Sequence, residues 1–204
     1  MSLSPQVQAA LIAVIGVALT LIVNRLLLEV TRRNERDAVI TAVRSDIRSI
    51  VHAVHEIGLV SSFLMTFRSP ADAPLYPPWV DSPRSEDYFQ LFGAIAPQIG
   101  RIPPGLAKEV VRFYTYFRVA RDAAAPLGLL KQSQAVDGQH IDHSRNVLFA
   151  LSQSFQAAEI VLSAAYSPSG RTDDGVETAK ALHKEIAETI SAKLVDGVTF
   201  KAAE

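Results

Sequence analysis

PQVQAALIAVIGVALTLIV, from Pro5 to Val23, contains no ionisable side chain. As an α-helix that rises about 1.5 Å per residue, this stretch spans roughly 28 Å, close to the hydrocarbon thickness of a bilayer. A helix satisfies its own backbone hydrogen bonds, so lipid tolerates Gly16 and the β-branched residues around it. The alternative is a buried core helix of a soluble protein, but such a helix usually carries a polar stripe. We therefore predict a transmembrane anchor over residues 1–24.

Basic residues follow this stretch, and none precedes it. Residues 1–4 carry no positive side chain, whereas the arginines that come after are Arg25, Arg32, Arg33, Arg36, Arg44 and Arg48. Positive charge stays on the cytoplasmic side during insertion, and a cleaved signal peptide would show the reverse order. Abundant arginine and alanine indicate a bacterial source. We expect a single-pass protein of a bacterial inner membrane, with its N-terminus outside and its C-terminal domain in the cytoplasm.

Small residues recur along one face of the predicted anchor. They are Ala9, Ala13, Gly16 and Thr20, at spacings of four, three and four. Such a stripe lets two membrane helices approach closely, so these residues are the predicted membrane packing face of a homo-oligomer.

Composition and charge exclude several classes of function. With no cysteine, the chain has no disulfide and no thiolate metal site. A net charge of -1 argues against nucleic acid as a partner. After the anchor, Arg25, Glu29, Arg33 and Asp37 alternate in sign at a spacing of four and form a possible ion-pair ladder. We interpret this ladder as a solvated helix face; the alternative is a sensor of lipid headgroups.

A heptad seam lies beyond the ladder. No proline occurs between Pro5 and Pro70, so the membrane helix is predicted to continue as one long cytoplasmic helix toward Phe67. The seam consists of Ile40, Val43, Ile47, Ile50, Val54 and Ile57. It would form either a parallel coiled coil between two anchored copies or one helix of an intramolecular antiparallel bundle. Matching apolar stripes downstream favour the bundle.

The remaining chain is predicted to supply the partner helices. A proline-rich loop is predicted over 69–84, and its Trp79 would cap the bundle or, alternatively, line a ligand site. A short helix is predicted to follow from Ser85 to Phe92 and to end at Gly93. The next helix begins at Pro103 and Pro104, and Pro126 interrupts it. Its predicted apolar face comprises Leu106, Val110, Phe113, Phe117 and Ala120, widened by Val111 and Tyr114.

Two further helices show the same periodicity. The first is predicted to bury Leu148, Leu151, Phe155, Ala158, Leu162 and Ala165. The second begins near Thr172 or Asp173, ends at Gly197, and carries Val176, Ala179, His183, Ile186, Ile190 and Leu194 on one face. No stretch alternates like a strand. The predicted fold is all-α, with a four- to five-helix bundle over 25–197 and a tail over 198–204.

A block in this region carries a resemblance to other proteins. Ile99, Gly100, Pro103, Leu106, Val110, Val111, Phe113 and Tyr114 fit the pattern IGxxPxxLxxxVVxFY. With the anchor and the long helix, this block resembles a set of uncharacterised bacterial single-span, membrane-anchored helical proteins. The resemblance implies an anchored helical fold and supplies no catalytic residue.

Histidines are the candidate metal ligands. His52 with His55, and His140 with His143, are each separated by three residues, which places each pair on one helical face. The Glu-x-x-His pattern of di-metal bundles is absent from the sequence, so we interpret these pairs as surface residues rather than a metal centre. His183, on an apolar stripe, is predicted to be a hydrogen-bonded core histidine.

Catalytic motifs are missing. The sequence contains no G-x-S-x-G, Walker, G-x-G-x-x-G or H-E-x-x-H pattern, and no cofactor is predicted. We expect a membrane-tethered interaction scaffold or accessory subunit with a protein partner rather than an enzyme. The alternatives are a membrane-linked signalling module and, less favoured, a metal-dependent helical-bundle enzyme.

Overall fold

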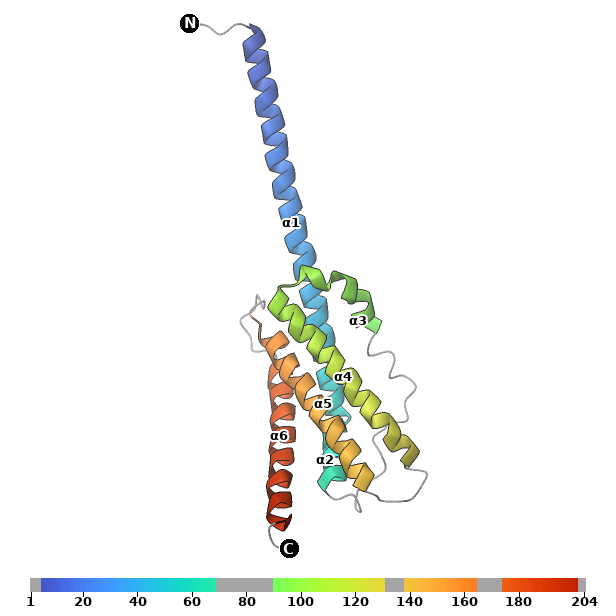
Figure 1. Cartoon of the computed structure of the whole chain (residues 1–204). Coiled ribbons are helices and arrows are strands. Elements are labelled where there is room, and N and C mark those ends of the chain that lie inside the picture. The colour runs from blue at the N-terminus through green and yellow to red at the C-terminus, as the bar shows by residue number, and fades with distance from the viewer. Residues whose placement is uncertain (1–4, 69–89, 131–137, 165–173, 202–204) are drawn as a thin grey trace. The chain divides into compact units, whose positions relative to one another are not determined.

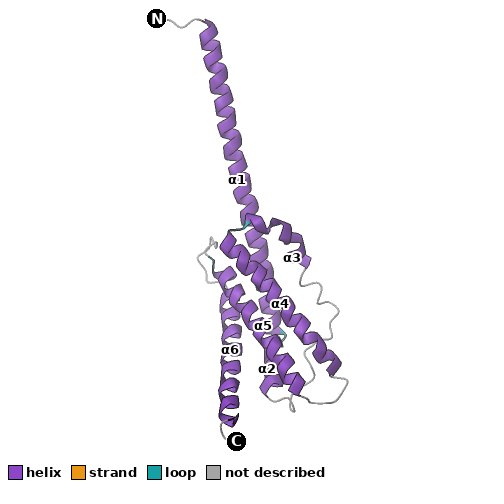
Figure 2. Ribbon diagram, viewed as in Figure 1, coloured by secondary structure: helices purple, strands orange, loops and turns teal. Residues whose placement is uncertain are grey.

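The computed structural model describes residues 5–68, 90–130, 138–164 and 174–201, with only the helical backbone described over 5–18, 90–91, 128–130, 138–140 and 194–201. Within these ranges every long element is a helix and no strand occurs (Figure 2). The helices are α1 (Pro5–Glu56), α2 (Leu59–Arg68), α3 (Gln90–Ile95), the 3-10 helix η3 (Ala96–Arg101), α4 (Pro104–Leu130), α5 (Gly138–Ser163) and α6 (Asp174–Lys201). The all-α prediction is confirmed.

The chain divides into two compact units, Met1–Thr41 and Ala42–Glu204. In the first unit, every side chain from Leu19 to Glu35 is exposed. Within this stretch, Arg33 Nε lies 3.2 Å from Glu29 Oε1 one turn away. The expected boundary after residue 24 stays a prediction.

Where the structure describes side chains, no single helix is both long enough and apolar enough to cross a membrane. Two consecutive helices, Leu19–Glu56 and Leu59–Arg68, meet the length and composition requirements together, with a bend of 49° between them. Most of the predicted span Pro5–Val23 lies outside the residues to which this finding applies. The anchor therefore stays a prediction.

The core of the second unit forms between helices that are distant in sequence. Helix α5 contacts α4, α6 and α2, and Figure 1 shows α4, α5 and α6 side by side. The bundle prediction is confirmed, because the apolar stripes of these helices face one another. The largest fully buried side chains include Phe63, Phe113, Phe117, Phe155, Ile47, Leu59, Leu148, Leu151 and Ile186.

The heptad seam lies inside this core. Val43, Ile47, Ile50 and Val54 are at most 3% exposed, and Ile40, in the first unit, is 2% exposed. Ile57 differs, since 48% of it is exposed. The seam of the second unit is thus covered within a single chain.

The predicted continuous helix toward Phe67 is wrong, because α1 ends at Glu56. Gly58 has φ of 64°, a left-handed conformation that glycine adopts without a steric penalty. Its N–H donates to the carbonyl of His55 at 3.0 Å, so this turn satisfies a carbonyl at the end of α1. The turn also rotates Ile57 out of the seam.

The helix ends predicted at other glycine and proline residues are mostly wrong. Gly93 and Gly197 do not end α3 and α6, which continue to Ile95 and Lys201. Among the described glycines only Gly58 has a positive φ, so the others lack the left-handed turn of a helix C-terminus. Helix α4 begins at Pro104 as predicted but also continues through Pro126 to Leu130. Proline removes one helical hydrogen bond, and burial of the neighbouring Ala124 and Leu127 stabilises the helix there.

The predicted apolar faces are largely correct. In α4, Val110, Phe113, Phe117, Ala120 and Tyr114 are buried, as are Leu148, Leu151, Phe155, Ala158 and Leu162 in α5 and Ala179 and Ile186 in α6. The prediction that Val111 belongs to the apolar face is wrong, because 41% of this residue is exposed. It lies about 100° around the helix from Val110, beyond the edge of the buried face. The loop over 69–84, Trp79, the helix start at Ser85, Ala165 and the side chain of Leu194 lie outside the described residues.

Candidate functional site

Within the part of the chain that the structure describes, the histidines do not form a metal centre. His52 Nε2 lies 3.4 Å from Asp174 Oδ1 at the start of α6, whereas His55 is exposed. Across the described part of the chain, no group of three or more histidine and acidic residues is arranged to hold a metal ion. His143 lies in α5, and the side chain of His140 is outside the described residues, so that pair stays a prediction.

His183 is hydrogen-bonded at the interface of α5 and α6, as predicted, but it is half-buried rather than a core residue. Its Nδ1 lies 2.9 Å from the Ser152 hydroxyl and 3.0 Å from the Ser152 carbonyl oxygen. Both partners belong to one residue of α5, so the contact fixes the imidazole against that helix.

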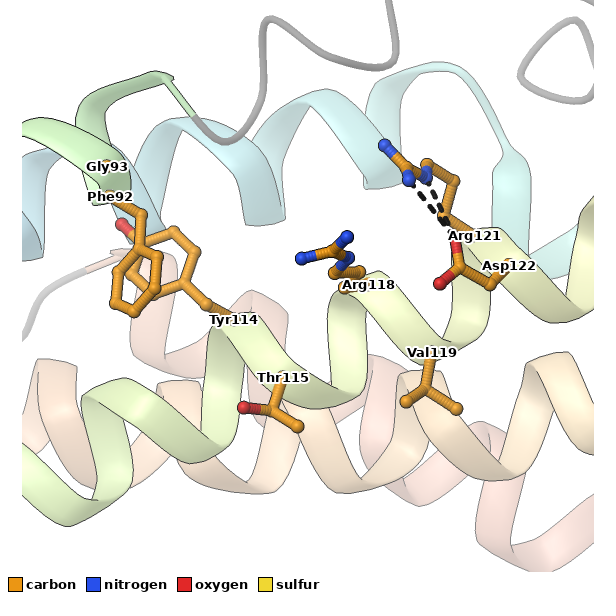
Figure 3. Close-up of a pocket in the computed structure, with 8 residues that line it drawn as sticks. All are labelled: Phe92, Gly93, Tyr114, Thr115, Arg118, Val119, Arg121 and Asp122. Carbon is orange, nitrogen blue, oxygen red and sulfur yellow. Dashed lines mark hydrogen bonds and ion pairs between the residues drawn. The ribbon is translucent and has the colours of Figure 1, made fainter. Parts of the chain in front are cut away.

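Among the residues that the structure describes, an open groove of about 560 Å³ runs along the outer side of α4, next to α3 (Figure 3). We call it the α3/α4 groove. Its lining residues are Phe92, Gly93, Tyr114, Thr115, Arg118, Val119, Arg121 and Asp122. All of them belong to the second unit, and those on α4 recur every three or four residues, which is the spacing of one helical face.

Two stacked aromatic rings form one end of the α3/α4 groove. The ring centroids of Phe92 and Tyr114 are 4.3 Å apart, with an angle of 28° between the ring planes. On the inner side, the Phe113 ring packs edge-on against the Tyr114 ring, with 5.1 Å between the ring centroids. Both contacts have geometries that aromatic rings prefer. Tyr114 is therefore held between a core residue and a residue of α3.

Beneath this end, the Tyr114 hydroxyl donates a hydrogen bond to Asp46 of α1. Burial raises the pKa of Asp46, although the hydrogen bond from Tyr114 partly opposes this effect. Burial, together with the neighbouring carboxylate, also raises the pKa of Tyr114 well above its ordinary value. The tyrosine is neutral at physiological pH and acts as a fixed donor.

Charged side chains occupy the other end of the α3/α4 groove. Arg121 Nε and Nη2 lie 3.2 and 3.1 Å from Asp122 Oδ1. Arg118 is exposed and lies between Tyr114 and Arg121 in Figure 3. Among the residues that the structure describes, none forms a hydrogen bond or ion pair with the Arg118 guanidinium. This end of the groove is suited to an anion.

A separate polar cluster joins α4 to α5. Arg112 Nη2 donates to the side-chain oxygens of Gln153 and Gln156, the latter at 2.7 Å, and Arg112 Nη1 lies 3.4 Å from Glu109. The guanidinium also sits over the Tyr116 ring at 5.9 Å from its centroid. Because its donors already have partners, this arginine contributes to helix pairing rather than to a site.

The lining of the α3/α4 groove combines aromatic, charged and hydroxyl side chains. Its lining residues contain two hydroxyls, those of Tyr114 and Thr115, and no histidine that could act as a base; the Tyr114 hydroxyl already donates to Asp46. Sequence reasoning assigned Tyr114 to the apolar face and missed both its hydroxyl partner and Arg118. The helical spacing of Tyr114, Arg118 and Asp122 was a usable signal, but Asp46 lies 68 residues away from Tyr114.

The chain matches no known protein family, no curated protein and no solved structure. The resemblance carried by the block from Ile99 to Tyr114 stays a prediction. Within the structure this block covers the end of η3 and the first turns of α4.

Proposed function

We propose that the chain is a membrane-tethered helical scaffold or accessory subunit. Its N-terminal segment would anchor it in a bacterial inner membrane, with the N-terminus outside. The helical bundle would then contact a protein partner at the cytoplasmic face. No catalytic step is part of this proposal.

Exposed apolar surface in the first unit is the observation that carries the proposal. Between Leu19 and Val30 of α1, the large apolar residues are 47% to 65% exposed. They are Leu19, Leu21, Ile22, Val23, Leu26, Leu27, Leu28 and Val30. They point to all sides of the helix, and apolar surface of this extent is typical of contact with a membrane or another protein. The preceding uncharged residues from Pro5 give the segment enough length for a bilayer.

The buried seam supports a scaffold over the signalling alternative. A two-chain coiled coil needs its seam exposed in each copy, yet Val43, Ile47, Ile50 and Val54 are buried within one chain. An intact bundle leaves the other helix faces available to a partner. The small-residue face of Ala9, Ala13, Gly16 and Thr20 remains a proposed contact between anchors; Gly16→Leu would weaken it.

Alkaline carbonate extraction of bacterial membranes tests the anchor. The full chain should stay in the membrane pellet. A double variant, Val14→Arg with Val17→Arg, places two charges in the middle of the proposed span, where each costs about 2.5–3.5 kcal/mol. We expect this variant to move to the soluble fraction.

The matched control adds the same charges elsewhere. Val111 and Phe149 are 41% and 56% exposed in the bundle, and the double variant Val111→Arg with Phe149→Arg should stay in the pellet. Release of the unaltered chain by carbonate would contradict the anchor. Equal release of both double variants would mean that the effect is not specific to the N-terminal segment.

A further inference from the structure

We propose that the α3/α4 groove binds a small aromatic anion, meaning a compound with one aryl ring and one carboxylate or phosphate group. This inference goes beyond the scaffold function and does not depend on it. Three features of the groove carry the inference: a guanidinium with no partner among the described residues, a fixed aromatic wall and a suitable volume.

The guanidinium of Arg118 selects for negative charge. It is exposed, and it has no ion-pair or hydrogen-bond partner among the described residues. A planar guanidinium binds carboxylate or phosphate through two parallel hydrogen bonds. Arg121 adds a second positive group, but Asp122, at 3.1 Å, offsets its charge. Arg118 is therefore the principal anion-binding group.

The aromatic wall selects for an apolar ring. Phe92 covers Tyr114, and the hydrogen bond to Asp46 holds Tyr114 in place. A wall that is already ordered loses little conformational entropy when a ligand stacks on it. Val119, 46% exposed, adds apolar surface on the same side of α4. An aryl group would therefore contact the outer face of Phe92 while its acid group reaches Arg118.

The size of the groove fits a compound of this kind. Its volume of about 560 Å³ lies within the range of pockets that bind small molecules, roughly 300–1,000 Å³. Asp122 at the rim disfavours a ligand with further negative charges at that end. In a ligand with one aromatic ring and one acid group, the ring would meet the aromatic end of the groove and the acid group would meet Arg118.

Fluorine NMR on the full chain in nonionic detergent micelles tests this proposal. The probes are 4-fluorophenyl phosphate and 4-fluorobenzoate, which distinguish the phosphate from the carboxylate form, and 4-fluorophenol, which lacks the acid group. We expect saturable line broadening by at least one anionic probe, with Kd on the order of 1 mM for a ligand of this size. The phenol should bind at least about tenfold more weakly.

Two arginine variants locate the binding. Arg118→Gln keeps a good helix former at an exposed position and should weaken binding about tenfold. Arg145→Gln is the matched control, because Arg145 lies on α5 and pairs with Asp142 at 3.2 Å; it should leave binding unchanged. Circular dichroism of both variants checks that the helices are intact, and Arg118→Lys should restore part of the affinity through its charge.

The aromatic end has its own variant, Phe92→Leu, which should weaken the anionic probes while leaving the fold intact. Absence of saturable binding of both anionic probes up to about ten times the expected Kd would overturn the proposal. Equal binding by the wild type and Arg118→Gln would overturn it as well, because the probes would then bind elsewhere. Carbonate extraction of the anchor is unaffected by either outcome.

Discussion

The Tyr114 hydroxyl donates a hydrogen bond to the Asp46 carboxylate, and this bond joins α4 to the bundle portion of α1. The pair combines a partly buried acid with a buried phenol. Burial raises the pKa of both groups, so folding disfavours the ionised carboxylate relative to the unfolded chain. The bond also orders the ring that forms the aromatic end of the α3/α4 groove.

Replacing Tyr114 and replacing Asp46 should have different effects on stability near neutral pH. Tyr114→Phe leaves the carboxylate without its donor and should lower the free energy of unfolding by about 1–3 kcal/mol. Asp46→Asn retains an acceptor for the tyrosine and removes a partly buried charge, so it should be at least as stable as the wild type. Urea unfolding followed by circular dichroism measures both variants. A loss of stability in Asp46→Asn as large as in Tyr114→Phe would contradict this account.

The same pair predicts a pH dependence. The folded state holds the Asp46 proton more tightly than the unfolded chain, whose pKa is near 3.8. The resulting stabilisation is present below that value and is lost as the pH rises through the folded pKa. The advantage of Asp46→Asn over the wild type should therefore shrink as the pH falls from 7 toward 4. An advantage that grows on acidification would contradict the raised pKa of Asp46.

The buried seam predicts that two isoleucines, one in α1 and one in the turn that follows it, contribute very differently to stability. Ile47 is fully buried, whereas 48% of Ile57 is exposed. Ile47→Ala should lower the free energy of unfolding by about 2–5 kcal/mol, and Ile57→Ala should change it by no more than about 0.5 kcal/mol. Thermal unfolding of the two variants provides the comparison. If Ile57→Ala also caused a large loss, the seam would extend past the end of α1.

The contact between α1 and the start of α6 predicts an acid-sensitive contribution. A hydrogen bond from His52, and to a lesser extent one from the Gly175 N–H, lowers the pKa of Asp174. A depressed folded pKa stabilises the protein above the unfolded value near 3.8, and this contribution disappears as the pH falls through the folded pKa. Asp174→Asn should thus lower Tm slightly at pH 6, and this difference should shrink as the pH falls below the unfolded value.

Asp142→Asn is the control for this comparison, since Asp142 pairs with Arg145 within α5. An ion pair within one exposed helix contributes little to stability. The Tm of this variant should stay close to that of the wild type at pH 6. A decrease in Tm for Asp174→Asn that does not shrink on acidification would assign the effect to something other than the carboxylate charge.

The turn after α1 predicts opposite effects for two glycines. Gly58 has φ of 64°, so Gly58→Ala should cost about 1–2 kcal/mol although no atom would clash with the added methyl group. Gly105 is helical, and a methyl group there also meets open space; Gly105→Ala should stabilise the protein by about 0.5–1 kcal/mol. Chemical unfolding of both variants tests the assignment, and stabilisation by Gly58→Ala would contradict the left-handed turn.

Periodicity predicted the buried faces because burial follows helical geometry closely. The stripe Leu148, Leu151, Phe155 and Leu162 is buried as expected. Helix ends were harder, since a glycine ends a helix only when it adopts a positive φ. Sequence reasoning assigned that role to Gly93 and Gly197 and missed Gly58, because a glycine's φ depends on the chain around it.

The α3/α4 groove was not predictable from the sequence for a different reason. Phe92 and Tyr114 lie on separate helices, and Asp46 is still more distant along the chain. Local patterns report which face of a helix is apolar, but they do not report which side chains meet across helices. The exposure of Arg118 also depends on this packing.

Cysteine labelling of bacterial spheroplasts tests the central claim of an anchored chain most directly. The natural sequence has no cysteine, so single substitutions report individual positions without background. Ser2→Cys lies before the proposed span, and Ser191→Cys is at an exposed position on α6. With a membrane-impermeant maleimide, we predict that Ser2→Cys reacts in intact spheroplasts and Ser191→Cys reacts only after lysis. Labelling of Ser191→Cys in intact spheroplasts would contradict the proposed topology, and protection of both positions until lysis would contradict an anchor that crosses the membrane.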